Sequence, residues 1–289
     1  AGGSAAEMAE LVARPDLDAV GKLRGIARLT VLRMARQPDR FRLLIRSEAE
    51  LPPELAESYD ASRRAVLKTV IEVVEQENPD LICLQEVDRN VKRTRHDDQP
   101  LRFVESFRPA AHLYQLNVRL KEGGYGNLLL SRWPLRSHHQ ISIRLDRRKP
   151  RGAQMCVVET PEGPLHLIHW HLGLNEKERH WQAAHLLQHA LFRRCCDLPT
   201  LIVGDFNDWR NTLGRRGALG VEGFRQVTAP LSRFRSFPAY LPMTALDKAY
   251  ARGPIAVRHA RIARSRIARD ASDHLPLVID FHLEPPPSA

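Results

Sequence analysis

The stretch LIVGDFNDWR at residues 201–210 joins an apolar run directly to a cluster of polar side chains. Leu, Ile and Val are typical of a buried strand. Gly, Asp and Asn are typical of a turn, because Asp and Asn side chains bond to their own backbone. The alternative is a functional site, since active residues of α/β sheets collect just past the carboxyl ends of strands. If the segment is part of a functional site, other strands of the chain should also end in reactive or charged side chains that complement it. A simple turn requires no such residues elsewhere.

Apolar runs of strand length recur along the chain and determine the expected fold class. We expect strands at 81–87, 114–118, 127–131, 140–145, 153–159, 165–171, 201–205, 245–252, 257–264 and 277–283. Helical spacing of apolar residues predicts one long helix that begins at Asp60 and stops before Asn78. Another helix is predicted from Asn175 to about residue 196. Strands with and without intervening helices predict an α/β fold, in which two mixed sheets pack face to face and helices cover the outside.

The pattern also divides the chain into parts. Residues 1–40 are basic and have apolar positions at helical spacing, which predicts an N-terminal helical extension. Residues 41–284 carry the strands and are expected to form one domain, whereas the Pro-rich tail at 285–289 is expected to be disordered. Loops predicted at 88–112 and 211–242, each with one short helix, are where we expect substrate choice to reside.

The net charge of +10 and the pI of about 9.9 suit a polyanionic partner such as nucleic acid, or an anionic membrane surface. This charge is spread along the chain without a block of like charges, so it adds only modest weight. No apolar run approaches the roughly 20 residues of a membrane span, and no signal peptide is visible. We therefore expect a cytoplasmic monomer.

The cysteines Cys83, Cys156, Cys195 and Cys196 include no CxxC pair. A zinc site is therefore not predicted, and reduced thiols are the simplest interpretation.

Other predicted strands also have polar residues at their ends. Gln85-Glu86 closes the run that begins at Leu81, and His169-Trp170-His171 closes the run LHLI. Ser272-Asp273-His274 precedes the last strand, and Asp247 lies in the short segment TALDKAY. Carboxylates, imidazoles and an amide together fit hydrolysis of a phosphate ester supported by a divalent metal. Mg²⁺ prefers one or two carboxylates plus water and phosphate oxygens, and His and Asp side chains serve proton transfer and charge stabilisation.

At these residues the sequence resembles the endonuclease/exonuclease/phosphatase superfamily, which includes deoxyribonuclease I and exonuclease III-type enzymes. The resemblance covers about residues 63–283 and rests on six blocks in order: LICLQEVD, YGNLLLSRWPL, HWHLGLNEKERHWQ, LIVGDFNDWR, LDKAYARG and ASDHLPLV. The GDFNDW form is most similar to uncharacterised bacterial members. The resemblance implies a four-layer α-β-β-α sandwich and Mg²⁺-dependent phosphoester hydrolysis, with Mn²⁺ as a substitute.

The resemblance also implies roles for single residues. Glu86 resembles the metal ligand, and Asp205 the residue that orients or deprotonates the attacking water. Asn207 resembles the amide that positions this water and the phosphate. His274 is expected to contact the scissile phosphate, and Asp247 to orient His274.

Four further positions follow from the same resemblance. His171, rather than His169, aligns with a histidine that contacts phosphate, and Asp273 could bear on the metal. Asn127 is expected on the substrate side, with a less defined role. From turn chemistry we expect Asp208 to be a turn or cap residue, and we expect Trp209 to pack rather than stack on substrate.

One feature of the family pattern is missing. Such proteins open with a strand that carries a metal-binding Asn, and the two alignable segments place Ala35 or Ser47 there instead. The site tolerates the loss, another element replaces the strand, or the domain is inactive. Two hypotheses follow: a Mg²⁺-dependent phosphohydrolase, with DNA as the default substrate and a phospholipid head group or small phosphorylated metabolite as the runner-up, or a catalytically silent module that binds a phosphate-bearing partner.

Overall fold

A computed structural model describes residues 66–214 and 217–284 of the chain. The predicted extension at 1–40 and the predicted tail at 285–289 lie outside the described residues. So do Ala35 and Ser47, the two candidates for the first-strand position.

The described strands form two larger sheets and one two-stranded sheet. The three-stranded sheet has the order β1-β3-β2 and is antiparallel, with β1 at Leu81–Arg89, β2 at Ala111–Arg119 and β3 at Gly124–Ser131. The six-stranded sheet has the order β4-β5-β6-β7-β9-β8. Its strands are β4 (Leu135–Ser142), β5 (Gly152–Thr160), β6 (Gly163–His171), β7 (Thr200–Asp205), β8 (Arg225–Gln226) and β9 (Asp247–Arg252). β10 (Ile255–Ile262) and β11 (Leu277–Leu283) form the small antiparallel sheet.

Helices connect and cover these sheets. Residues 66–77 are helical and precede β1, as predicted from the apolar face of that segment. The other helical elements are η2 (Lys92–Thr94), α5 (Gln99–Phe107), α6 (Glu176–Gln188), α7 (Ala190–Arg193), α8 (Ala218–Val221), η3 (Leu231–Arg233) and α9 (Arg266–Ala271).

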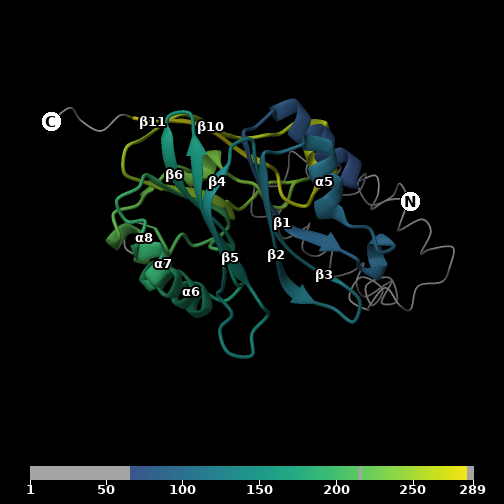
Figure 1. Cartoon of the computed structure of the whole chain (residues 1–289), viewed down its shortest axis with the longest axis horizontal. Coiled ribbons are helices and arrows are strands. Elements are labelled where there is room, and N and C mark those ends of the chain that lie inside the picture. Colours follow the sequence, from purple (N-terminus) through teal and green to yellow (C-terminus); the bar gives the residue numbers. More distant parts are fainter. Residues whose placement is uncertain (1–65, 215–216, 285–289) are drawn as a thin grey trace, which may run out of the picture. The chain divides into compact units, whose positions relative to one another are not determined.

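The period of two along each strand creates separate cores on the two faces of each sheet. In β3, Leu129 points to the core between the two larger sheets, whereas Leu128 and Leu130 point to the core under α5 and the helix at 66–77. In β6, Leu167 joins the core between the sheets, whereas Trp170 joins the core under α6, α7 and α8. Figure 1 shows α6–α8 and α5 on opposite outer sides of the two sheets. The predicted four-layer α/β sandwich is thus confirmed.

Several elements depart from the prediction, and three of them show why. The helix that begins after Asn175 ends at Gln188, because His189 has extended backbone and its side chain caps the separate helix α7. α9 was not predicted; it is one short turn-and-a-half capped by the Ser265 side chain, and it has little apolar periodicity. β4 begins at Leu135, earlier than expected, because its outward face is polar and exposed and carries no apolar signal.

Candidate active site

Three neighbouring strands of the six-stranded sheet bring polar residues into one row, at the end of the sheet where β6 and β7 terminate. His171 ends β6, Asp205 ends β7 and Asp247 begins the antiparallel strand β9, and neighbours are in register across the sheet. Nδ1 of His274, from the segment before β11, lies 2.8 Å from Oδ2 of Asp247. We call these four residues the edge row. The structure thus brings together four residues that were predicted from four separate sequence blocks.

Asp247 holds His274 in its charged form. Burial alone would lower the pKa of the imidazole. The hydrogen bond and charge of Asp247, aided by Asp205 and Asp273, outweigh burial and raise the pKa of His274 to about 9. The ring of Phe237 also packs on the imidazole, with 4.8 Å between ring centroids. His274 is therefore an oriented cation at neutral pH.

Asp205 is buried but remains the charged partner of the row. Burial would raise the pKa of this carboxyl, but His171, the charge of His274 and the backbone N–H of Asn207 together hold it below its usual value. That N–H donates to Asp205 Oδ1 over 2.8 Å. Gly204 before it has a φ of +138°, and a Cβ there would lie 2.0 Å from the Trp170 carbonyl oxygen. Only glycine lets β7 approach β6 closely enough to place Asp205 here.

Asn207 lies on the same turn, with its backbone in the left-handed region at a φ of 49°. Its side-chain nitrogen donates to the Leu172 carbonyl over 2.9 Å, which ties the loop after β7 to the loop after β6. This bond orients the amide and leaves its oxygen facing away from that carbonyl. The predicted pair Asp205 and Asn207 is therefore held as one rigid unit.

His171 stands between a cation and a carboxylate. Its Nε2 lies 2.7 Å from Nη1 of Arg151 and 3.3 Å from Oδ2 of Asp205. Arg151 can only donate. His171 Nε2 therefore accepts from Arg151 when it is unprotonated, or donates to Asp205 when it is protonated, but it cannot make both bonds at once. Arg151 and His171 are both buried at the edge of the sheet. Together they place a guanidinium and an imidazole beside the Asp205 carboxylate.

Glu86 lies on the other larger sheet, at an irregular point of β1. Register with β3 shifts between Leu84 and Val87, and Glu86 has a φ of 56°. Its carboxylate is about half exposed, 3.5 Å from Nζ of Lys149 and 3.9 Å from Nη1 of Arg151. The bulge thus turns this carboxylate out of the strand and toward Arg151, which also contacts the edge row.

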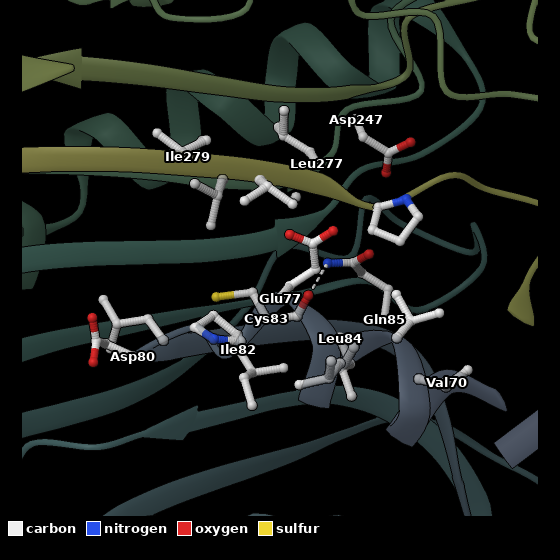
Figure 2. A pocket seen from close by; sticks show the side chains of 18 of the residues that line it. Val70, Glu77, Asp80, Ile82, Cys83, Leu84, Gln85, Asp247, Leu277 and Ile279 are labelled. Carbon is white, nitrogen blue, oxygen red and sulfur yellow. Dashed lines mark hydrogen bonds between the residues drawn. The ribbon is translucent and has the colours of Figure 1, made fainter. Parts of the chain in front are cut away.

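A cavity of about 780 Å³ connects Glu86 with part of the edge row. It is lined by consecutive residues of β1 and of β11, so it runs along the edges of these strands rather than over one face. Figure 2 shows Leu277 and Ile279 of β11 across from Ile82 and Leu84 of β1. The lining is mostly apolar and includes Glu86, Asp247 and His274, together with other titratable residues such as Glu77 and Asp80 (Figure 2).

His169, which the sequence separated from His171, belongs to a buried polar chain between the sheets. Its Nδ1 lies 2.8 Å from Oε1 of Gln154, which can only accept, so the ring proton is on Nδ1. Its Nε2 therefore accepts from Nε2 of Gln85, 2.6 Å away. Burial lowers the pKa of His169 to about 3. This neutral histidine joins β6 to the residue just before Glu86.

Asp208 supports the loop and takes no part in the edge row. Its carboxylate accepts from the backbone N–H groups of Thr212 and Leu213, both at 3.0 Å. Nζ of Lys248 lies 3.6 Å from this carboxylate and also donates to the Asp208 carbonyl oxygen. Nη2 of Arg179 lies 3.9 Å away. We call Asp208, Lys248 and Arg179 the loop anchor; the predicted turn role of Asp208 agrees with these bonds.

Three further predicted positions have different environments. Trp209 was expected to pack, but 58% of it is exposed, with the Arg210 guanidinium 4.7 Å from the ring centroid. Asn127 lies fully buried beneath the site and donates to the Gly152 carbonyl over 3.1 Å, next to Arg151. Asp273 is exposed, and its carboxylate accepts from the Ser272 hydroxyl over 3.3 Å.

Sequence reasoning missed Arg151 and Lys149. A signal existed for Arg151, because β5 and β6 form a tight antiparallel hairpin with Ala153 opposite Trp170. The residue just before β5 must then lie beside the end of β6, where His171 is. Lys149 had no such signal, since it lies on a loop whose path the sequence does not determine.

Two classes of feature are not found in the part of the chain that the structure describes. No three His, Cys, Asp or Glu side chains converge as a ready-made metal centre among residues 66–214 and 217–284. Within the same residues, no helix combines the length and apolar character needed to cross a membrane.

Known proteins resemble this chain in sequence and in fold. Residues 43–274 match the model of the Endonuclease/Exonuclease/phosphatase family. The uncharacterised protein YbhP of Escherichia coli is 30% identical over 240 residues, which cover 77% of this chain and 90% of YbhP. A mannosyl-6-phosphatase structure from Bacteroides thetaiotaomicron has a TM-score of 0.60 at 14% identity, covering 80% of this chain and 95% of that one. The human nocturnin catalytic domain with bound sulfate has a TM-score of 0.57 at 20% identity, covering 76% and 87%.

Proposed function

The chain belongs to the endonuclease/exonuclease/phosphatase family, and from this premise we propose that it is a metal-dependent phosphoric ester hydrolase. The observation that carries the proposal is the edge row: an ionised, buried Asp205 lies between His171 and the Asp247–His274 pair. A base and an acid whose surroundings push their pKa values apart are what hydrolysis by an activated water requires.

Each residue then has a separate task at the phosphate. Asp205 accepts a proton from the attacking water, and the Asn207 amide, fixed by its bond to the Leu172 carbonyl, orients that water. Arg151 and His171 donate to phosphate oxygens and balance their charge. His274, charged below about pH 9, stabilises the developing charge or protonates the leaving oxygen.

We propose that Glu86 holds the divalent ion, Mg²⁺ or Mn²⁺. A half-exposed carboxylate fits this ion, because Mg²⁺ is often bound through one or two carboxylates while waters and phosphate oxygens supply the other ligands. The ion would supply positive charge next to the phosphate. Asp273 is the second carboxylate we propose for the metal, from the segment that carries His274. Lys149 and Arg151 lie within 4 Å of the Glu86 carboxylate and balance part of its charge.

DNA is our first proposed substrate. The net charge of +10 favours a polyanion. Trp209 and Arg210, exposed two and three residues after Asn207, provide a ring and a cation of the kind that single-stranded nucleic acids stack on.

A phospholipid head group is the second candidate, and a specific observation favours it. Tyr240, Leu241 and Met243 are exposed on a loop whose Phe237 packs on His274. An apolar protrusion beside a phosphate site suits a substrate that lies at a membrane surface. The name of the mannosyl-6-phosphatase keeps a small phosphorylated metabolite open as well.

The test is hydrolysis of bis(p-nitrophenyl) phosphate, plasmid DNA and phosphatidylglycerol vesicles with Mg²⁺, Mn²⁺ or EDTA. We compare wild type with Glu86→Gln, and with Glu105→Gln on the exposed face of α5 as the matched control. We expect wild-type turnover that EDTA abolishes. Glu86→Gln should reach comparable turnover only at much higher Mg²⁺ concentrations, and Glu105→Gln should behave like wild type. Absence of turnover on all three substrates with either metal would favour the catalytically silent module instead.

A further inference from the structure

Exposed apolar side chains cluster at one loop of the chain. In the described residues ten large hydrophobic side chains are exposed, and three of them lie within four positions: Tyr240 at 75%, Leu241 at 39% and Met243 at 49%. Single exposed apolar residues are ordinary on protein surfaces, whereas a contiguous group marks an interaction site.

A small hairpin presents these side chains. Phe237 and Thr244 form a bridge, with the Thr244 N–H donating to the Phe237 carbonyl over 2.9 Å. The Leu241 N–H closes the tip on the Pro238 carbonyl over 3.0 Å. The tip is therefore a formed structure that holds three apolar side chains outward. We call residues 237–244 the apolar hairpin.

The apolar hairpin is fixed to the edge row. The Ala239 N–H donates to the Asp273 carbonyl over 2.7 Å, and the Leu275 N–H donates to the Ser236 carbonyl over 2.9 Å. These two bonds flank His274, whose ring also contacts Phe237. Whatever surface the tip binds is thus held close to the candidate active site.

Exposed arginines lie on the segments that share a core with the hairpin base. Between residues 223 and 269 the chain has nine arginines and Lys248 but a single acidic residue, Asp247. Although the charge of the whole chain is spread evenly, this stretch is one-sided. Five of its arginines are exposed close to the hairpin base or to α9, which share one core: Arg233, Arg235, Arg264, Arg266 and Arg269. Among the described residues none of these five has a carboxylate at ion-pair distance.

We propose that the apolar hairpin and these five arginines dock the chain on the surface of an anionic phospholipid bilayer. Leu, Met and Tyr at an exposed tip can enter the boundary between head groups and acyl chains. Arginines around them meet the negative head groups, and each contributes to binding as long as it lies within a Debye length of the surface. The proposal concerns binding only, so it holds whether or not the proposed hydrolysis is confirmed.

The favoured partner is a bilayer rather than nucleic acid. A tip that stacks on bases needs flat rings, and only one of the three exposed side chains is aromatic. Leu241 and Met243, with Pro242 between them, instead offer flexible aliphatic surface of the kind that inserts into lipid. The arginines suit either partner, so the aliphatic character of the exposed side chains is what favours a bilayer over nucleic acid.

The test is sedimentation of the full chain with vesicles of equal parts phosphatidylcholine and phosphatidylserine, and with vesicles of phosphatidylcholine alone. We expect binding to the mixed vesicles that weakens with salt, and little binding to phosphatidylcholine. Tyr240→Ser/Leu241→Ser/Met243→Ser should weaken it at least about tenfold. Arg233→Gln/Arg235→Gln/Arg266→Gln should weaken it on the order of a hundredfold at low salt.

Matched controls make the result specific. Leu101→Ser/Leu120→Ser/Val221→Ser removes three exposed apolar side chains elsewhere, and Arg108→Gln/Arg119→Gln/Arg194→Gln removes the same charge from other surfaces. Both controls should bind mixed vesicles like wild type. Bis(p-nitrophenyl) phosphate hydrolysis without vesicles should be equal in the hairpin variant and wild type.

Three outcomes would overturn the proposal. Wild type would fail to sediment with mixed vesicles, or the controls would lose binding as much as the hairpin variants. In the third, the hairpin variant would lose binding to a single-stranded oligonucleotide but keep vesicle binding, and the hairpin would then be a nucleic-acid surface. If the wild type bound mixed vesicles but hydrolysed no substrate, that result would count only against the proposed function.

Discussion

The edge row and the loop anchor lie on either side of the same turn, and each contains a buried aspartate. The two aspartates differ in the groups that balance their charge. Asp205 and Asp208 are three residues apart and both buried. Asp208 is satisfied by two backbone N–H groups and by Lys248, all within the protein. Asp205 receives one backbone N–H and otherwise faces imidazoles that can also bind substrate. Burial therefore does not distinguish Asp208, which supports the loop, from Asp205, which we propose to be reactive; their partners do.

The largest expected effect concerns the loop anchor. Lys248→Met leaves the buried Asp208 carboxylate with Arg179, 3.9 Å away, as its remaining cation, and breaking one side of a buried pair costs about 3–5 kcal/mol of unfolding free energy. Urea unfolding of the purified variant measures this. The double variant Lys248→Met/Asp208→Asn should lose less unfolding free energy than the sum of the losses in the two single variants. Each single variant leaves one charge of the pair buried, whereas the double variant removes both. A loss below about 1 kcal/mol for both single variants would show that the anchor does not hold the turn.

The next effect concerns His274 and pH. Asp247 raises the pKa of His274 from 6.5 to about 9, so the folded protein holds this proton more tightly than the unfolded chain. The resulting stabilisation, about 3 kcal/mol at most, is fully present below pH 6.5 and is lost as pH rises through 9. NMR titration of His274 in metal-free protein should give a midpoint well above 7.

Asp247→Asn supplies the control for this pH effect. It should lower the His274 midpoint and flatten stability between pH 6.5 and 9, because the charge that holds the proton is removed. A wild-type midpoint at or below 6.5 would contradict the assignment of His274 as an oriented cation.

A smaller effect is expected at His169. Replacing it with Leu leaves the Gln85 and Gln154 amides without their partner, which costs about 1–3 kcal/mol. If the proposed metal role of Glu86 holds, the Mg²⁺ concentration for half-maximal hydrolysis should also rise, since Gln85 precedes Glu86. His169→Asn, which keeps a donor and an acceptor, should recover part of both losses. Equal Mg²⁺ dependence in all three proteins would limit His169 to a structural role.

The smallest effect on stability is expected at Trp209. Its side chain is more than half exposed, so Trp209→Ala should change unfolding free energy by less than about 0.5 kcal/mol. If DNA is the substrate, affinity for a single-stranded oligonucleotide should fall about tenfold, because base stacking on an aromatic ring is lost. A large loss of stability would mean that the ring packs after all, as the sequence suggested.

The sequence predicted the parts of this site that depend on local pattern. Leu201–Val203 reads as a buried strand, so Asp205 had to lie at its end. The same reasoning placed Glu86, the block His169–His171 and His274 at strand ends, and the family resemblance then singled out His171. The turn role of Asp208 also followed from local chemistry, because its bonds reach only four and five residues ahead.

The rest depends on contacts between distant segments. Lys248 approaches Asp208 from another strand, and no local signal in LDKAY distinguishes a buried lysine from a solvated one. Trp209 was expected to pack, but 58% of it is exposed. His169 and His171 share one motif, and only the strand register shows that one lies between the sheets and the other at the edge.

The most direct test of this account is the hydrolysis rate of bis(p-nitrophenyl) phosphate per mole of folded protein for Asp205→Asn and Asp208→Asn, with Mg²⁺. We predict that Asp205→Asn stays folded and loses about 10²–10⁴-fold in rate, as expected when a general base is removed. Asp208→Asn should lose stability but keep most of the rate in the molecules that remain folded. Equal losses in both variants, or a rate unchanged by Asp205→Asn, would contradict the distinction between the edge row and the loop anchor.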